Sequence, residues 1–295
     1  MVTLGIDIGA TKTAVGMFDG SRIVHSGVTP SGDYKSTMNN IGGLVAGWDT
    51  HDSIQAVGVA CTGPFDIETG VILNEATLKG WFGKSIPNAI HSLFGVSTAL
   101  LNDADAAVLG EVFEGNNGLI ETEPAVMLTF GTGVGGAFWD GKHVYSGAFG
   151  EHPEIGHIGV DPNGPLCYCG LRGCLESVAS GAAIDGFAKD LGLGGIEALD
   201  EAIESGNVYA VDLANRTQAA ILYALVTLTH TFRPSCFILG GGVMDSLHRF
   251  LTPAKIPVNA STVPGPPPRI LLASLGNRAG MFGASVAARR LLDDH

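Results

Sequence analysis

The sequence has 295 residues, of which 45% are hydrophobic, 15% are charged and 43 are glycine. This composition excludes a disordered chain, and the length favours two lobes that share a cleft. The formal net charge of −13 argues against a nucleic acid partner, although backbone N–H groups and a divalent cation still allow a nucleotide to bind. The N-terminus lacks the features of a signal peptide and no stretch has the character of a membrane span, so we expect a cytoplasmic protein without a membrane partner.

The first part of the chain predicts an α/β fold. Strand-like stretches at 2–8, 12–18 and 22–28 are separated by turn signals and indicate a β-meander. Strands and helices then alternate. The expected elements are helices near 34–47, 84–94 and 104–113 and strands near 54–60 and 96–101.

The second part repeats this pattern. Stretches at 124–130, 135–141 and 143–147 predict a second meander, in which Gly131-Thr132-Gly133 corresponds to Gly9-Ala10-Thr11. The sequence therefore predicts two related α/β halves. The remaining features are a glycine- and cysteine-rich insertion at 147–176, helices near 178–190, 210–231, 244–252 and 279–292, a proline-rich loop at 264–268, and strands at 236–239 and 269–273.

The turns of the two hairpins are candidate phosphate-binding loops. Each places small residues and a threonine between two strands, where N–H groups and a hydroxyl can face phosphate oxygens. Asp7 stands just before the first turn and is a candidate for holding Mg²⁺, directly or through water. Two ordinary hairpins are the structural alternative, but the occurrence of the turn twice, together with Asp7, favours phosphate binding.

Two other nucleotide motifs are rejected. GTGVGG at 131–136 fits the dinucleotide fingerprint G-x-G-x-x-G, but that fingerprint opens a helix, whereas the strand-like AFWDGKHVY follows here. A GxxxxGK[ST] P-loop is absent from the sequence.

Asn102 and Asp103 end an apolar strand and precede a helix, which is a common place for functional side chains in an open α/β sheet. Either residue can instead simply cap the helix. A kinase with a sugar acceptor needs one carboxylate to accept the hydroxyl proton and one polar neighbour to orient the sugar. Asp103 and Asn102 can fill these two roles.

The segment from His157 to Cys174 contains a candidate metal site. His157, Cys167, Cys169 and Cys174 lie within eighteen residues, spaced by glycines and prolines that let the loop fold back. This donor set is typical of tetrahedral zinc, and four protein ligands leave no open position, so we expect a structural ion. The cysteines at 61 and 236 lie in apolar stretches and are interpreted as core residues.

Around the cysteine-rich loop, Glu154, His157 and Glu176 are candidate acceptors for sugar hydroxyls, although a solvated surface role is the alternative for each glutamate. Further along, FILGGGV at 237–243 is a strand that leads into three glycines and a helix. The missing side chains would let an adenine or ribose lie against the backbone.

Taken together, these motifs resemble the ROK family of bacterial sugar kinases along almost the whole chain. The features that carry the resemblance are DIGATKT at 7–13, LNDADAA at 101–107, TFGTGVGGA at 129–137, EIGH at 154–157, CYCGLRGCLE at 167–176 and LGGGV at 239–243.

The resemblance implies an actin-like ATPase fold (ribonuclease H-like, duplicated) that binds ATP, Mg²⁺ and a sugar. Its lobes would span 1–115 and 116–278, with the insertion at 147–176 in the second and the helix at 279–292 returning to the first. We also expect a homodimer. By the resemblance, Asp103 matches the catalytic base. Asn102, Asp103, Glu154, His157 and Glu176 match sugar-binding positions, Asp7, Gly9, Thr11, Lys12, Gly131, Thr132, Gly133, Gly241 and Gly242 match nucleotide-binding positions, and His157, Cys167, Cys169 and Cys174 match zinc ligands.

The resemblance leaves the sugar open. EHPEIGH is similar to fructokinase members, whereas DPNGPLCYCGLRGCLE is similar to glucokinase and N-acetylmannosamine kinase members. We expect phosphorylation at the 6-hydroxyl, with glucose as the first choice of sugar, then N-acetylmannosamine, then fructose.

Two other classes of protein are disfavoured. A repressor of this family would carry a helix-turn-helix domain before the first hairpin, and a sugar sensor can dispense with Asp7, Asp103 or the phosphate glycines, all of which are present.

Overall fold

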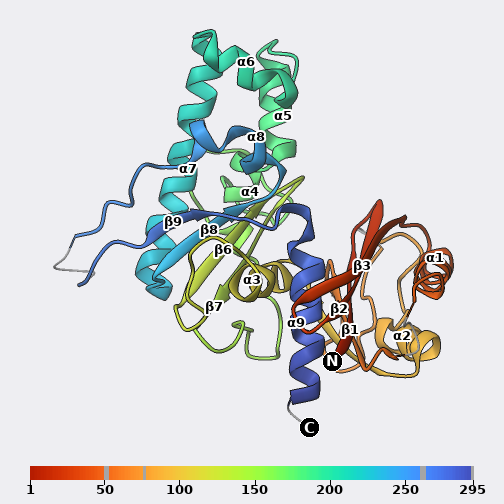
Figure 1. Ribbon diagram of the computed structural model, residues 1–295. Coiled ribbons are helices and arrows are strands. Elements are labelled where there is room, and N and C mark those ends of the chain that lie inside the picture. Colours follow the sequence, from red (N-terminus) through yellow and green to blue (C-terminus); the bar gives the residue numbers. More distant parts are fainter. Residues whose placement is uncertain (50–52, 76–77, 260–263, 294–295) are drawn as a thin grey trace. The chain divides into compact units, whose positions relative to one another are not determined.

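The computed structural model describes residues 1–49, 53–75, 78–259 and 264–293 (Figure 1). Contacts group the chain into two compact units. The first comprises Met1–Gly118, Ser146–His152 and Asn277–His295, and the second comprises Leu119–Tyr145 and Pro153–Gly276. The segment Ser146–His152 thus belongs to the first unit, although the sequence analysis placed it in an insertion of the second half.

The first unit is built on a five-stranded sheet of order β3-β2-β1-β4-β5. β1 pairs antiparallel with β2 and parallel with β4, so a hairpin is extended by parallel strands. Its elements are β1 (Val2–Ile8), β2 (Lys12–Asp19), β3 (Arg22–Pro30), α1 (Tyr34–Ala46), β4 (Ala56–Cys61), α2 (Ile86–Phe94), β5 (Ser97–Asn102), α3 (Asp103–Phe113) and α9 (Ala279–Asp293).

The two faces of β1 pack against different helices because its side chains alternate. Leu4, Ile6 and Ile8 point into an apolar core shared with α1 and α2. The other face meets α9, as Figure 1 shows for this unit. A Cβ at Gly5 or at Gly58 of β4 would overlap the backbone of α9, so glycine at these positions lets the helix lie close to the sheet.

The second unit is built on a four-stranded sheet of order β7-β6-β8-β9. β6 pairs antiparallel with β7 and parallel with β8, which is the pairing of β1 with β2 and β4. The prediction of two related halves is therefore confirmed. The elements are β6 (Ala125–Phe130), β7 (Val134–Trp139), α4 (Leu175–Ala179), α5 (Gly181–Asp190), α6 (Leu199–Glu204), α7 (Val208–Phe232), β8 (Cys236–Gly240), α8 (Gly242–Leu251) and β9 (Arg269–Leu272), with 3-10 turns at Ile155–His157, Ile196–Ala198 and Gly276–Arg278.

Two predicted elements of this unit are wrong in detail. The expected strand at 143–147 does not form, because the Asp140 carboxylate accepts the N–H groups of Lys142 and His143 and turns the chain, leaving Val144 with only an isolated bridge to Trp139. The expected helix at 178–190 is divided into α4 and α5, because the backbone of Ser180 is extended (φ −69°, ψ 158°). The Ser180 hydroxyl caps α5 by accepting the N–H of Ala183.

A core of aliphatic and aromatic side chains holds the second unit together. Val126, Leu128 and Phe130 of β6 and Phe237 and Leu239 of β8 are buried against the long helix α7 and its neighbours. The short helix α6, which the sequence analysis missed, packs on α7. Among the described residues, no helix is both long enough and apolar enough to cross a membrane.

Candidate active site and metal centre

Asp7 and Asp103 form an acidic pair in the first unit. Asp7 lies on β1, and Asp103 opens α3 directly after β5, with β4 between the two strands. Removal of water by the surrounding protein, together with the negative charge of Asp103, raises the pKa of Asp7 to about 6, while Lys12 opposes the shift. Two carboxylates that repel each other in this way favour a shared proton or a bound cation.

Asn102 and Asp103 both contact the first turn of α3. The Ala104 N–H donates to Asn102 Oδ1 at 2.8 Å and to Asp103 Oδ1 at 2.9 Å. The capping role considered for these residues is therefore present, and it also fixes the Asp103 carboxylate at the start of the helix. The side chain is exposed to solvent, yet the protein atoms around it raise its pKa, against the lowering effects of the Ala104 N–H and His152.

His152 is a neighbour of this pair that sequence reasoning missed. Its Nδ1 lies 2.9 Å from Asp105 Oδ1, and the two side chains are only 14% and 16% exposed. The one signal in the sequence was the His-Pro-Glu of EHPEIGH, which was used only to compare sugars. Nothing in the sequence showed that the segment before it belongs to the first unit.

The predicted phosphate turns are tight in both units. In the first, the Gly9 N–H donates to the Lys12 carbonyl at 3.0 Å, and Thr11 and Lys12 are exposed. In the second, the Gly131 N–H donates to the Gly133 carbonyl at 2.9 Å. Each turn thus presents backbone and a threonine at the surface of its own unit, which is suitable for contacting phosphate oxygens.

Glu176 supports the second turn directly. It lies in the first turn of α4, and its Oε2 accepts the Val134 N–H at 2.8 Å. A Cβ at Gly133 would lie 2.5 Å from the same oxygen, so glycine is needed there for the carboxylate to approach. One oxygen of this predicted sugar-binding residue therefore holds the turn between β6 and β7.

The predicted adenosine loop at the end of β8 also depends on a glycine. Gly241 has φ of +90°, and a Cβ at this position would meet the backbone of Phe130. The exposed Gly242 begins α8, and nothing lies within 4 Å of where its Cβ would be. The backbone here is open to a flat ligand group.

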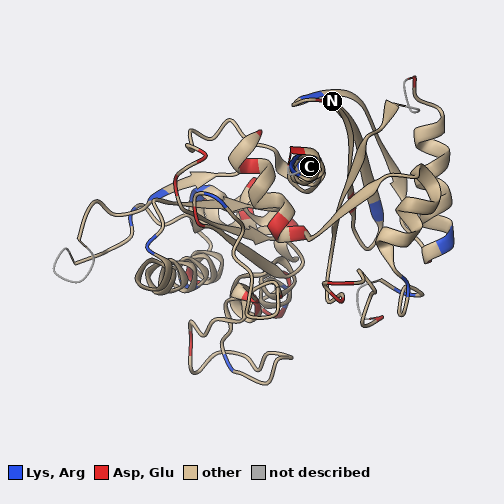
Figure 2. Ribbon diagram, turned by 90° about the horizontal axis from the view of Figure 1, so that it is seen from below, with Lys and Arg blue, Asp and Glu red and all other residues tan. Residues whose placement is uncertain are grey.

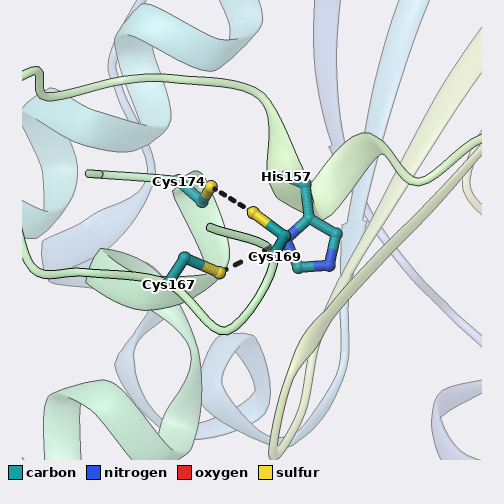
Figure 3. A group of neighbouring side chains, drawn as sticks. All are labelled: His157, Cys167, Cys169 and Cys174. Carbon is teal, nitrogen blue, oxygen red and sulfur yellow. Dashed lines mark hydrogen bonds between the residues drawn. The ribbon is translucent and has the colours of Figure 1, made fainter. Parts of the chain in front are cut away.

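The four predicted zinc ligands converge in the second unit, as Figure 3 shows. One ligand atom from each of His157, Cys167, Cys169 and Cys174 lies within 4.8 Å of all the others. Cys167 Sγ is 3.4 Å from His157 Nδ1, and Cys169 Sγ is 3.5 Å from Cys174 Sγ. Tetrahedral zinc with bonds of about 2.3 Å to sulfur and about 2.0 Å to nitrogen requires edges of roughly 3.5–3.8 Å. The residues therefore fit a zinc ion.

The remaining nitrogen of His157 faces Tyr168, a second residue that sequence reasoning missed. Tyr168 Oη lies 3.0 Å from His157 Nε2, and the side chain is 83% exposed. The partial removal of water by neighbouring protein atoms, together with the carboxylates of Glu176 and Glu154, raises the pKa of Tyr168 to about 12. The predicted sugar-binding residues Glu154, His157 and Glu176 thus all act on one hydroxyl group, that of Tyr168.

The acidic pair gives a prediction about stability. Folding raises the pKa of Asp7 from 3.8 to about 6, so the folded state holds its proton more tightly and loses stability as pH rises through this window. We expect Asp7→Asn to stabilise the protein at pH 7.5 by up to about 3 kcal/mol, with a smaller gain at pH 4.5. Urea unfolding at both pH values measures this. An equal difference at the two pH values, or a less stable variant at pH 7.5, would contradict the shift.

The chain is similar to known sugar kinases along most of its length. The model of the ROK family matches residues 3–290. A glucokinase from Streptomyces coelicolor is 32% identical, with 98% of each chain covered, and an N-acetylmannosamine kinase from Escherichia fergusonii is 31% identical over 82% of this chain and 84% of the relative. Among solved structures, a ROK hexokinase from Thermus thermophilus is 28% identical with a TM-score of 0.81, and each chain is fully covered.

A second solved structure contains ligands. A ROK family glucokinase from Streptomyces griseus, in complex with glucose and AMPPNP, is 30% identical with a TM-score of 0.74, over 98% of this chain and all of the other. Fold and relatives together define a sugar kinase with an actin-like ATPase fold. The chain belongs to the ROK family. Figure 2 shows Lys and Arg in short, separate stretches of the described chain.

Proposed function

We propose that the protein transfers the γ-phosphoryl group of ATP to the 6-hydroxyl of a hexose, and that glucose is its preferred acceptor. The observation that carries this proposal is the Asp7–Asp103 pair, which lies on β1 and directly after β5 of one sheet, in a chain with relatives named glucokinase. The expected order of acceptors is glucose, N-acetylmannosamine and then fructose.

In this reaction Asp103 accepts the proton of the acceptor hydroxyl as its oxygen attacks the γ-phosphorus. The bond from phosphorus to the β,γ-bridging oxygen breaks, and ADP leaves with the electron pair. Asn102 orients the sugar beside Asp103. Mg²⁺, when bound, neutralises charge on the phosphates, and Asp7 is the carboxylate proposed to hold it, directly or through water.

In the second unit, Glu154, His157 and Glu176 are proposed to accept hydrogen bonds from sugar hydroxyls, in the way that they surround the Tyr168 hydroxyl. The turn at Gly131, Thr132 and Gly133, together with that at Gly9, Thr11 and Lys12, supplies N–H and side-chain donors to phosphate oxygens. Gly241 and Gly242 leave room for adenosine. Zinc, held by His157 and the three cysteines, would fix the loop that carries His157.

The second candidate is an N-acetylmannosamine kinase, which the relative from Escherichia fergusonii favours at nearly the same identity. The two functions are separated by kcat/KM for glucose, N-acetylmannosamine and fructose, measured by ADP release at fixed ATP. We expect glucose to give the highest value, by at least about tenfold. A higher kcat/KM for N-acetylmannosamine would assign the protein to the second function.

A further inference from the structure

The pair of His152 and Asp105 has no role in the reaction described so far. Asp105 is two residues after Asp103 on α3, and residues at this spacing do not face each other on a helix. The Asp105 side chain therefore cannot hold the Asp103 side chain in place by direct contact. His152 reaches Asp105 from the segment Ser146–His152, which is part of the same unit.

The contact with Asp105 indicates which nitrogen of the imidazole carries a proton. A carboxylate only accepts hydrogen bonds, so at 2.9 Å it is Nδ1 of His152 that carries the proton given to Asp105 Oδ1. This hydrogen bond sets the orientation of the ring, and Nε2 takes no part in it. Because both side chains are more than four-fifths buried, the bond is shielded from water and holds its geometry better than a surface ion pair.

The ring also acts on Asp103 through its charge. His152 is among the groups that lower the pKa of the Asp103 carboxyl, whereas Asp105 raises it. The first unit thus contains the carboxylates of Asp7, Asp103 and Asp105, and Lys12 lowers the pKa of Asp7 as His152 lowers that of Asp103. When its ring is protonated, His152 offsets the repulsion that these carboxylates exert on the base.

We propose that His152, held by Asp105, is a positioning residue that sets the placement and charge environment of the Asp103 carboxylate. This inference rests on the proposed role of Asp103 as the base. Asp105 orients the imidazole, and the imidazole supports Asp103, so that removing either partner misplaces the base without removing it.

The test is a double-mutant cycle on the full-length protein. We expect His152→Ala to lower kcat about 10- to 100-fold, as small misplacements of a reacting group do, with KM for ATP within about threefold of wild type. In the Asp103→Asn background, the same His152→Ala change should lower kcat by less than about twofold, because the group through which it acts is already lost. Residual rates are measured by ADP release at high enzyme concentration.

Two further variants keep the test independent of folding. His152→Asn keeps an amide donor at the position of Nδ1, the nitrogen that bonds Asp105, and should recover at least about half of the loss in log kcat caused by His152→Ala. His143→Ala is the matched control, because His143 pairs with Asp140 at 4.0 Å but both side chains are exposed, at 65% and 49%. This control should leave kcat unchanged.

The outcomes are distinguishable. If His152→Ala lowers the melting temperature but leaves kcat of the folded enzyme intact, the pair is only a structural contact and the inference fails. If His152→Ala lowers kcat by the same factor in both backgrounds, His152 does not act through Asp103, and the inference also fails. If Asp103→Asn is itself nearly fully active, the proposed base is wrong, which is a separate failure.

Discussion

Asp103→Asn is expected to lower kcat by about 10²–10⁴-fold at saturating sugar and ATP, because a positioned general base contributes about this factor to the rate. The variant is nearly isosteric. Its side-chain oxygen can still accept the Ala104 N–H that Asp103 accepts at 2.9 Å, so the start of α3 should be preserved. Nucleotide affinity, measured by calorimetry, should stay within a few-fold of wild type.

The matched control for this variant is Asp33→Asn. Asp33 also stands at the start of a helix, where its carboxylate accepts the Ser36 N–H at 2.8 Å, but it lies on the exposed surface before α1. Its replacement should cost at most about 1 kcal/mol of stability and leave kcat unchanged. If Asp103→Asn retained more than about a tenth of wild-type kcat, Asp103 would be a helix cap or a sugar-positioning group, and the base would have to be sought at Asp7, Asp105 or Glu154.

Loss of one zinc ligand should have the second largest effect. We expect wild-type protein to carry one zinc ion per chain and Cys169→Ser to lose it during purification, since a hydroxyl is a much weaker ligand than a thiolate. Cys169 is exposed, so its substitution disturbs no packing. With His157 released from the metal, KM for the sugar should rise by about tenfold or more. Metal analysis and sugar titration measure the two effects.

Cys236→Ala provides the control, because Cys236 is a buried thiol of β8 outside the cluster. It should keep both the zinc and the KM for sugar. Limited proteolysis adds an independent readout, since the segment from His157 to Cys174 should become sensitive to protease only when the metal is lost. Full zinc content together with an unchanged KM in Cys169→Ser would show that the four residues do not form the expected site.

Much of the fold was predictable because the sequence signals were local. Alternating apolar residues marked the strands of both hairpins, and the zinc ligands lie within one short segment, so spacing alone indicated that they converge. The errors also have local causes. The turn formed by Asp140 and the break at Ser180 depend on single side chains that bond the backbone, and these are hard to separate from ordinary strand and helix residues in a sequence.

The residues missed in the candidate site depend on contacts between distant parts of the chain. His152 meets Asp105 across 47 positions, and the Val134 N–H reaches Glu176 across 42. No periodicity or motif encodes such a pairing. Tyr168 was overlooked for a different reason, because a tyrosine between two metal-binding cysteines has no chemical role until the second nitrogen of His157 is seen to face it.

The most direct test of the central claim is to follow ATP and sugar together. The protein is incubated with ATP, Mg²⁺ and glucose, ADP is measured, and the phosphorylated carbon is identified by NMR. The account predicts one ADP for each molecule of glucose 6-phosphate, and little ADP when glucose is omitted. Binding of glucose without formation of ADP or of a sugar phosphate would contradict it, and the same result with N-acetylmannosamine and fructose would identify the protein as a sugar sensor.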